Sequence, residues 1–220
     1  MILNLYKPLG LTSHDVVNQV RKITGERKVG HGGTLDPLAE GVLVIGVGRE
    51  STKQLKSILE DTDKEYEATI EFGKISSTDD SEGDITDTKA DLSKLTLEDI
   101  ETVLKKFVGT IEQVPPIYSA IKVKGQRAYK LARSNKPILL SPRKVNIKTI
   151  ELLEYNPPEL KFITTVSSGT YVRSLARDIG ASLNVGGYLK TLRRTRVGRF
   201  FIGDSLTLED LPQQVKMMDT

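Results

Sequence analysis

An aspartate stands directly before a proline in a glycine-rich stretch that ends in an apolar run. The stretch covers residues 29–48 and reads VGHGGTLDPLAEGVLVIGVG, so Asp36 follows three glycines and a histidine, His31. Glycine permits positive φ and lets another chain come close, and a residue before proline is held extended. Together these residues predict a rigid loop that presents one carboxylate toward a ligand rather than toward the core.

The same stretch fits two simpler interpretations. Asp36 could cap a short turn with Pro37 at its first position, but a cap explains neither the glycines nor His31. A phosphate-binding loop of a nucleotide-binding enzyme would end in Gly-Lys-Ser/Thr, whereas TLD follows the glycines here. An acid in that place would repel phosphate. A reaction centre is therefore the interpretation that uses all of these residues.

Composition limits the chemistry that the chain can perform. Its 220 residues are 38% hydrophobic and 28% charged, which is ordinary for a globular protein. The absence of cysteine excludes disulfides and thiolate chemistry. With His14 and His31 as the only histidines, a zinc site of the usual type is not expected. No stretch approaches a membrane span and the first residues lack a signal peptide, so we expect a cytoplasmic protein.

The net charge of +3 hides a strong segregation of charge along the chain. No acid occurs between Glu112 and Glu151, where nine lysines and arginines lie, and a second basic cluster covers 190–199. Residues 60–101, by contrast, are rich in Asp and Glu. A short charge run is usually a solvated surface, but a basic stripe of this length, with a second cluster, indicates a nucleic-acid partner.

Apolar periodicity predicts strands and helices that alternate along the chain. In the helix expected at 96–109, Leu97, Ile100, Val103, Leu104 and Phe107 should face the core. Hairpin-like connections between the strands favour an α+β fold with a mixed, mostly antiparallel sheet flanked by helices. We expect strands at 4–10, 41–48, 64–73, 143–155, 159–169 and 195–205, helices at 12–25, 52–60, 96–109, 127–134 and 170–183, a long loop at 74–94 and a helical turn from 207.

Six segments of the chain closely resemble those of the bacterial TruB-type tRNA pseudouridine synthases. In order they are KPLGLTSHDVV, GHGGTLDPLAEGVLVIGVGRESTK, DKEYEATIEFG, VPPIYSAIKVKGQRAYKLAR, SSGTYVRSLARDIG and LRRTRVG, and the match runs from residue 2 to about 212. The resemblance implies the pseudouridine-synthase fold and isomerisation of uridine 55 in the T-loop of tRNA to pseudouridine. It also implies that the reaction uses no cofactor and no metal.

The resemblance assigns catalytic roles to three residues. Asp36 would be the catalytic carboxylate that attacks the flipped nucleotide, either at the ribose or at the base. Tyr66 would stack on the target base and accept the proton that the base releases. Arg173 would pair with Asp36, lowering its pKa and fixing its rotamer. Taken alone, Tyr66 would be an ordinary strand aromatic and Arg173 a surface helix residue.

The remaining residues implied by the resemblance would contact the RNA. His31 would fill the space left by the flipped base, and Leu192 would contact the uracil unless it is plain core. Lys64 would have a structural or phosphate role, and Arg193 and Arg194 would meet phosphate. Extruding a base costs a few kcal/mol, which stacking on protein side chains can return at about 1–3 kcal/mol per base.

The resemblance also predicts how the chain is divided. We expect a catalytic domain at 1–212 with a basic, thumb-like insertion at about 115–148 that clamps the T-arm, a tail at 213–220, no C-terminal PUA domain, and a monomer. Gly32 departs from the family, which usually has Thr or Ser there. The competing function is a tRNA-binding protein or RNA chaperone that performs no chemistry.

Overall fold

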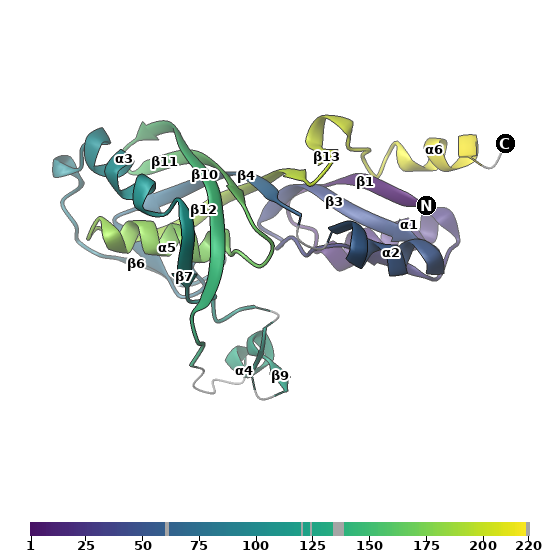
Figure 1. Ribbon diagram of the computed structural model, residues 1–220, viewed down its shortest axis with the longest axis horizontal. Helices are drawn as coiled ribbons and strands as arrows, with labels where there is room; N and C mark the ends of the chain where they lie inside the picture. Colours follow the sequence, from purple (N-terminus) through teal and green to yellow (C-terminus); the bar gives the residue numbers. More distant parts are fainter. Residues whose placement is uncertain (60–61, 120, 124, 134–138, 219–220) are drawn as a thin grey trace. The chain divides into compact units, whose positions relative to one another are not determined.

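The chain folds into two compact units. The computed structural model describes residues 1–59, 62–119, 121–123, 125–133 and 139–218 (Figure 1). The first unit comprises Met1–Glu67 and Leu192–Thr220, and the second comprises Ala68–Thr191. Strands β4 (Lys64–Phe72) and β12 (Gly187–Val197) contribute to both units. The domain expected over residues 1–212 is therefore built from two units that the chain connects within strands.

The first unit is built around β3, the apolar strand that follows the glycine-rich stretch. β3 pairs antiparallel with β1 and β2 and parallel with β12, whose end pairs with β13. The elements of this unit besides β4 and β12 are β1 (Ile2–Lys7), α1 (Ser13–Thr24), β2 (Val29–His31), β3 (Ala39–Val47), α2 (Arg49–Leu59), β13 (Phe200–Phe201), a 3₁₀ turn η2 (Ile202–Asp204) and α6 (Leu211–Met218).

Helix α1 forms where its capping residues predict it. The Thr12 side chain accepts a hydrogen bond from Asp15 N while the Asp15 side chain accepts one from Thr12 N, which is a complete capping box. Gly25 ends the helix in the left-handed conformation, at φ 68°. The predicted helix at 12–25 is confirmed, and its apolar face supplies Val16, Val17 and Val20 to the core.

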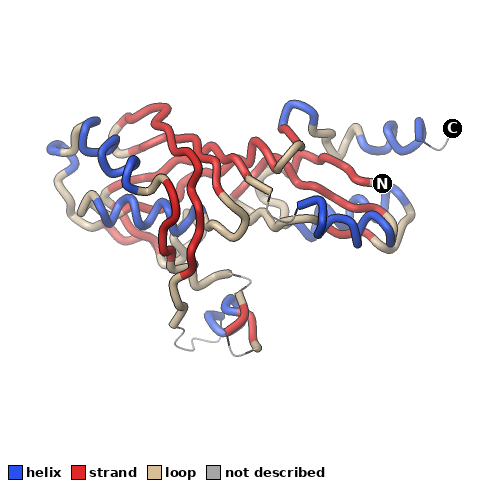
Figure 2. Tube along the Cα trace, viewed as in Figure 1, coloured by secondary structure: helices blue, strands red, loops and turns tan. Residues whose placement is uncertain are grey.

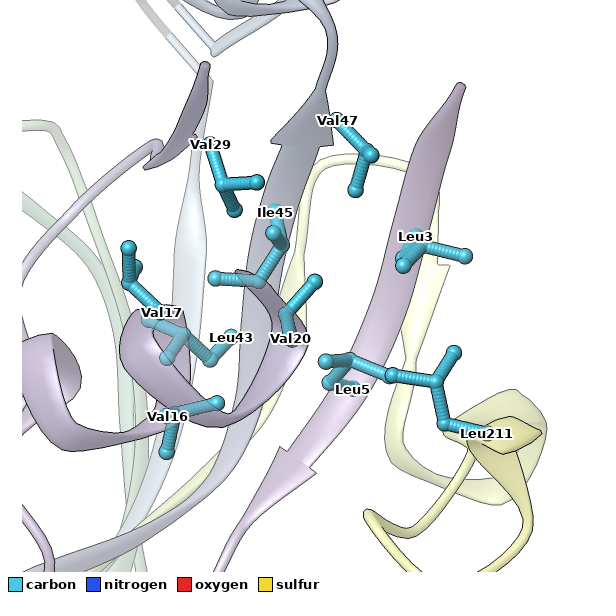
Figure 3. Packing of buried hydrophobic residues seen from close by; sticks show 10 residues of the cluster. All are labelled: Leu3, Leu5, Val16, Val17, Val20, Val29, Leu43, Ile45, Val47 and Leu211. Carbon is cyan, nitrogen blue, oxygen red and sulfur yellow. The ribbon is translucent and has the colours of Figure 1, made fainter. Parts of the chain in front are cut away.

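The two faces of β3 are covered by different helices. Side chains alternate along a strand, so Leu43, Ile45 and Val47 face α1 in the cluster that Figure 3 shows. Val42 and Val44 lie in a second cluster with Leu55 and Leu59 of α2. Burial on both faces explains why the sequence of β3 is continuously apolar, as predicted. The strand is thereby a fixed support for the loop that precedes it.

The second unit is a mostly antiparallel sheet with α3 and α5. Its strands follow the order β12-β4-β11-β10-β7, and Figure 2 shows β10 and β11 as one long hairpin. The fold is α+β with mixed, mostly antiparallel strands, as predicted. The elements of this unit besides β4 and β12 are β5 (Lys74–Ser76), β6 (Ile85–Asp87), η1 (Leu92–Lys94), α3 (Leu97–Lys106), β7 (Gly109–Gln113), β8 (Lys122–Val123), β9 (Gln126–Arg127), α4 (Ala128–Arg133), β10 (Arg143–Asn156), β11 (Glu159–Val166) and α5 (Val172–Ser182).

The predicted insertion at about 115–148 contains a separate two-stranded sheet. β8 pairs antiparallel with β9, and α4 follows directly. Lys124, between these two strands, lies outside the described residues, as do residues 134–138. The C-terminal part of the predicted insertion is not separate from the main sheet, because Arg143–Ile147 of β10 pair with β7 there.

Four local expectations from the sequence are wrong. The segment 74–94 is not a loop but carries the paired strands β5 and β6 and the turn η1. The final long strand is β12, which begins at Gly187 rather than at Thr195, and only the two-residue β13 follows it. Leu97 at the start of α3 is 53% exposed. The expected tail from residue 213 is largely α6, whose Leu211 is fully buried.

No helix within the described residues is long and apolar enough to cross a membrane.

Candidate active site

Asp36 opens a tight turn at the entrance to β3. Ala39 N donates to Asp36 O at 3.0 Å, so residues 36–39 form a β-turn with Pro37 at its second position, where the fixed φ of proline is suited. Gly10 N, from the loop after β1, donates to Pro37 O at 2.9 Å. Asp36 itself is half-buried. The turn interpretation of Asp36 is correct for its backbone.

The hydroxyl of Ser13 is hydrogen-bonded to both backbone groups of Leu35, the residue before Asp36. Leu35 N donates to Ser13 Oγ at 2.8 Å, and Ser13 Oγ donates to Leu35 O at 2.9 Å. Both residues are buried. The loop 32–36 is thus fixed to the first turn of α1. Sequence reasoning missed this contact, because Ser13 lies 22 residues from Leu35 and no distinctive pattern surrounds it.

We expect the Ser13→Ala variant to release the backbone at Leu35. The substitution leaves a buried donor and a buried acceptor without their partner, at a cost of about 1–3 kcal/mol. Hydrogen exchange of the Leu35 amide should accelerate about 10- to 100-fold. Thr12→Ala, which removes the cap of the same helix, serves as the control and should leave the Leu35 amide protected. A Leu35 amide that keeps its protection in Ser13→Ala would contradict the role of the hydroxyl.

Arg194 is an internal support for the same loop. Its side chain is 2% exposed, and its guanidinium donates to Val42 O at 2.8 Å, to Gly33 O at 3.2 Å and to Thr34 O at 3.4 Å. Through these three hydrogen bonds, Arg194 connects β12 to β3 and to the loop. Gly41, its parallel partner, has φ 104°, and a Cβ there would overlap Arg194 O, so this close strand approach requires glycine.

Two basic side chains beside the loop have pKa values below their usual ones. Burial lowers the pKa of His31 below its usual value, with Arg194 and His14 adding to the shift, so the imidazole is neutral at pH 7. Burial lowers the pKa of Lys64 to about 8, and the positive charge of Arg194 adds to it. Lys64 Cε and Arg194 lie within 4 Å of the place where a side chain on Gly33 would begin. This corner of the site thus concentrates positive charge in a partly dry environment.

The other predicted residues of the first unit differ in exposure. Tyr66 on β4 is 7% exposed and Leu192 on β12 is 8% exposed, so both are largely buried. Arg193 is exposed and lies 3.5 Å from Glu40 Oε1, and the Glu40 carboxylate also accepts a hydrogen bond from the Tyr6 hydroxyl. Neighbouring positions on a strand point to opposite faces, which explains why Arg193 is exposed while Arg194 is buried.

Arg173, the predicted partner of Asp36, lies in the second unit on the first turn of α5. Its NH1 group is 3.2 Å from Asp80 Oδ2, and its NH2 group donates to Tyr118 O at 2.9 Å. Both charged side chains are buried, so Arg173 is no surface helix residue. Asp80 also accepts from Thr78 Oγ1 and from Glu82 N. Sequence reasoning missed Asp80 because it lies in the acidic segment interpreted as a loop.

Among the described residues, no group of three or more His, Cys, Asp or Glu side chains is arranged to hold a metal ion. The arrangement that remains is a carboxylate on a braced loop, with a tyrosine, a neutral histidine and basic side chains in the same unit. Such a set can supply a nucleophile, a stacking surface and charge for an anionic ligand.

Family models match nearly the whole chain. The model described as TruB family pseudouridylate synthase (N terminal domain) matches residues 21–172, and the model described as tRNA pseudouridylate synthase B C-terminal domain matches 173–220. Curated relatives named tRNA pseudouridine synthase B include that of Mycobacterium sp. (strain KMS), 47% identical over 96% of this chain and 71% of the relative. That of Francisella philomiragia subsp. philomiragia is 48% identical over 96% of this chain and 69% of the relative.

Solved structures agree with the family models. A crystal structure of a Cbf5-Nop10-Gar1 complex contains a chain with TM-score 0.76 and 33% identity over 99% of this chain. An H/ACA RNP bound to a substrate RNA containing 2'-deoxyuridine contains one with TM-score 0.72 and 31% identity. The present chain spans 55% and 54% of those two longer chains.

Proposed function

Because the chain belongs to the TruB family of pseudouridylate synthases, which are isomerases, we propose that it converts uridine 55 in the T-loop of tRNA to pseudouridine. Asp36 is the catalytic carboxylate in this proposal. The observation that supports it is the bracing of residues 32–37, whose backbone forms hydrogen bonds with Ser13, Arg194 and Gly10. Bracing of this kind fixes a nucleophile near the reacting atom, and position alone supplies a large part of a rate enhancement.

The reaction exchanges one bond of the nucleotide for another. The bond between ribose C1' and uracil N1 breaks, the uracil turns, a bond forms between C1' and C5, and C5 loses its proton while N1 gains one. Asp36 attacks either the ribose or the base, and it leaves again when the new bond forms. Tyr66 accepts the proton from C5. The product is an isomer of the substrate, so the step requires no oxidant, reductant or co-substrate.

We propose that the other residues of the first unit hold the extruded nucleotide and the RNA around it. Tyr66 stacks on the uracil and Leu192 contacts its edge. His31, neutral at pH 7, fills the space that the base leaves, a contact that does not need charge. Exposed Arg193 meets phosphate, whereas Arg194 is turned inward to three carbonyl groups, so we now assign it to holding the loop.

The second unit and the insertion complete the proposal. Arg173 pairs with the Asp36 carboxylate while Asp80 holds its guanidinium. The basic insertion at about 115–148 binds the T-arm, which makes affinity for tRNA fall with rising salt. The protein acts as a monomer in the cytoplasm.

Two measurements test the function directly. Purified protein is incubated with unmodified tRNA, and pseudouridine is mapped by position. Release of tritium from tRNA that carries 5-tritiated uridine measures turnover, because the C5 proton is lost only when the new bond forms. Pseudouridine at position 55 with release of tritium supports the proposal. Binding of tRNA without tritium release would instead support the RNA-binding protein that performs no chemistry.

Lys64 should make tRNA binding depend on pH. Its pKa is about 8, so raising the pH from about 7 to about 9 removes a positive charge that an unperturbed lysine would keep up to about 10.4. If this charge meets phosphate, affinity measured by filter binding should fall a few-fold over that range. Arginine stays charged throughout, so Lys64→Arg should bind with little change in affinity across the range. An equal fall in affinity for Lys64→Arg would contradict the role of Lys64.

A further inference from the structure

The loop that carries Asp36 meets α2 through a row of glycines. Gly30 and Gly46 are cross-strand partners in the β2–β3 pair, and Gly32 follows β2 directly. Helix positions three and four apart share one face, and this face of α2 covers the glycines. A Cβ on Gly30 would lie 3.7 Å from Thr52 Cγ2, and one on Gly46 would lie 3.0 Å from Leu55 Cδ1. The helix therefore approaches the strands closely.

The contact at Gly32 is the tightest of these. A Cβ on Gly32 would overlap Leu59 Cδ1 and would lie 3.2 Å from Leu59 Cγ and 3.5 Å from Leu55 Cδ2. Gly32 does not have a positive φ, so space rather than backbone conformation demands glycine here. Leu59 is 6% exposed and is held in a cluster with Val42 and Val197. The end of its side chain occupies the place that a side chain on residue 32 would take.

Leu59 also borders open space. It lines a pocket of about 310 Å³ together with Ile58, Val197 and Phe200. A leucine beside an empty pocket can turn away from the loop at small cost, because only the end of a flexible side chain has to move. The end of the Leu59 side chain makes the closest side-chain contact at Gly32, and this contact can be broken without unfolding the unit.

We propose that Leu59 is a positioning residue for Asp36, acting through its contact with Gly32. The proposal rests on the proposed function of Asp36. Ser13 and Arg194 hold the loop at residues 33–35, and Leu59 fixes its first residue, whose amide donates to Val44 O at 2.9 Å. With both ends fixed, the backbone that carries Asp36 is held relative to β3. Loss of the contact at Gly32 moves the loop while the residues that bind RNA keep their places.

A double-mutant cycle tests this role. Leu59→Ala removes the contact, and Gly32→Ala displaces Leu59 into the pocket, so both changes break the same interaction. A small misplacement of a catalytic group lowers turnover strongly, and we expect kcat to fall about tenfold in each variant. Because the contact is lost only once, the double variant should lose about tenfold rather than a hundredfold. KM for tRNA should stay within about twofold of the unchanged protein.

Ile58→Ala is the matched control. It removes apolar packing from the same helix and the same pocket but faces away from Gly32, so it should lower the free energy of unfolding without lowering kcat. The proposal is overturned if Ile58→Ala lowers kcat as much as Leu59→Ala, or if the two effects on kcat multiply in the double variant.

A different result would show that the proposed function is wrong. An unchanged protein that forms no pseudouridine contradicts that function. The contact is then tested by hydrogen exchange of the Gly32 amide. Acceleration in Leu59→Ala that Gly32→Ala does not increase further supports the contact, and an unchanged exchange rate overturns it.

Discussion

The Asp36→Asn variant is expected to bind tRNA as the unchanged protein does and to form no measurable pseudouridine. The amide is not a nucleophile and carries no charge, so turnover should fall about 10⁴-fold or more, as it does when an enzyme loses its nucleophile. Binding should survive because the loop is held through backbone groups, by Ala39 N and Gly10 N, which the substitution does not change. Tritium release measures turnover, and filter binding measures affinity.

Asp15→Asn is a suitable control for Asp36→Asn. It neutralises another aspartate of the same unit, one whose carboxylate caps α1 and is exposed. Loss of this cap costs about 1 kcal/mol and should leave turnover intact. Near-full turnover in Asp36→Asn would contradict this role, because it would show that the carboxylate has no part in the chemistry.

Elements with local signals could be predicted from the sequence. The capping residues of α1 lie within the helix and its flanks, so the bounds of the helix follow from a short segment. The alternation of Tyr66, Ala68, Ile70 and Phe72 predicts the buried face of β4, and all four are buried. In both cases one face of the element packs against the core, and apolar residues recur in the sequence with the spacing of that face.

Elements that depend on distant partners could not be predicted in the same way. The exposed strand β6 is followed by Thr88, whose hydroxyl donates to Gly73 O and to Val185 O, nearly a hundred residues away in the case of Val185. The start of β12, GYLKT, shows no regular alternation of apolar and polar residues, and its pairing decides its structure. A strand whose register is set by such contacts leaves no clear period in its own residues.

The candidate site shows the same division. Asp36 could be found because its neighbours, glycines and proline, are unusual in themselves. The role of Arg194 could not, because an arginine in a basic cluster is usually exposed, and only the parallel pairing of β12 with β3 turns it inward. The contact between Gly32 and Leu59 likewise depends on how α2 packs. Residue types therefore indicate the chemistry, and tertiary packing decides which of them act on the substrate and which hold the loop.

The Arg173→Lys variant is expected to keep the fold of the second unit and to lose about 100-fold in turnover. The guanidinium reaches the Asp80 carboxylate with one nitrogen and the carbonyl of Tyr118 with another. A lysine keeps the charge but has a single nitrogen and cannot reproduce this planar fork. The charge proposed to face Asp36 would then lose its fixed direction. Tritium release measures the loss, and thermal unfolding shows whether the unit remains folded.

Arg177→Lys provides the matched control on the same helix. Arg177 pairs with Asp79 at 2.7 Å and donates to Val114 O, but its side chain is 29% exposed. The lysine keeps a positive charge opposite Asp79, and Arg177 is more exposed than Arg173, whose side chain is 8% exposed, so this variant should keep turnover within about twofold of the unchanged protein. Equal losses in Arg177→Lys and Arg173→Lys would mean that α5 tolerates no change of this kind, and Arg173 would have no special role.

Asp80→Asn tests whether the function of Arg173 depends on the position that Asp80 gives it, because the variant leaves Arg173 itself unchanged. The asparagine oxygen can still accept from Thr78 Oγ1 and Glu82 N, as Asp80 does, but the negative charge opposite the buried guanidinium is lost. Removing one member of a buried ion pair costs about 3–5 kcal/mol when nothing replaces it, and here the asparagine NH2 group, which cannot accept from Arg173 NH1, takes the place of Oδ2. If Arg173 acts through the position that Asp80 gives it, Asp80→Asn lowers kcat, leaves the affinity for tRNA unchanged and adds little to the loss in Arg173→Lys. Independent losses in the double variant would instead place the two residues in separate roles.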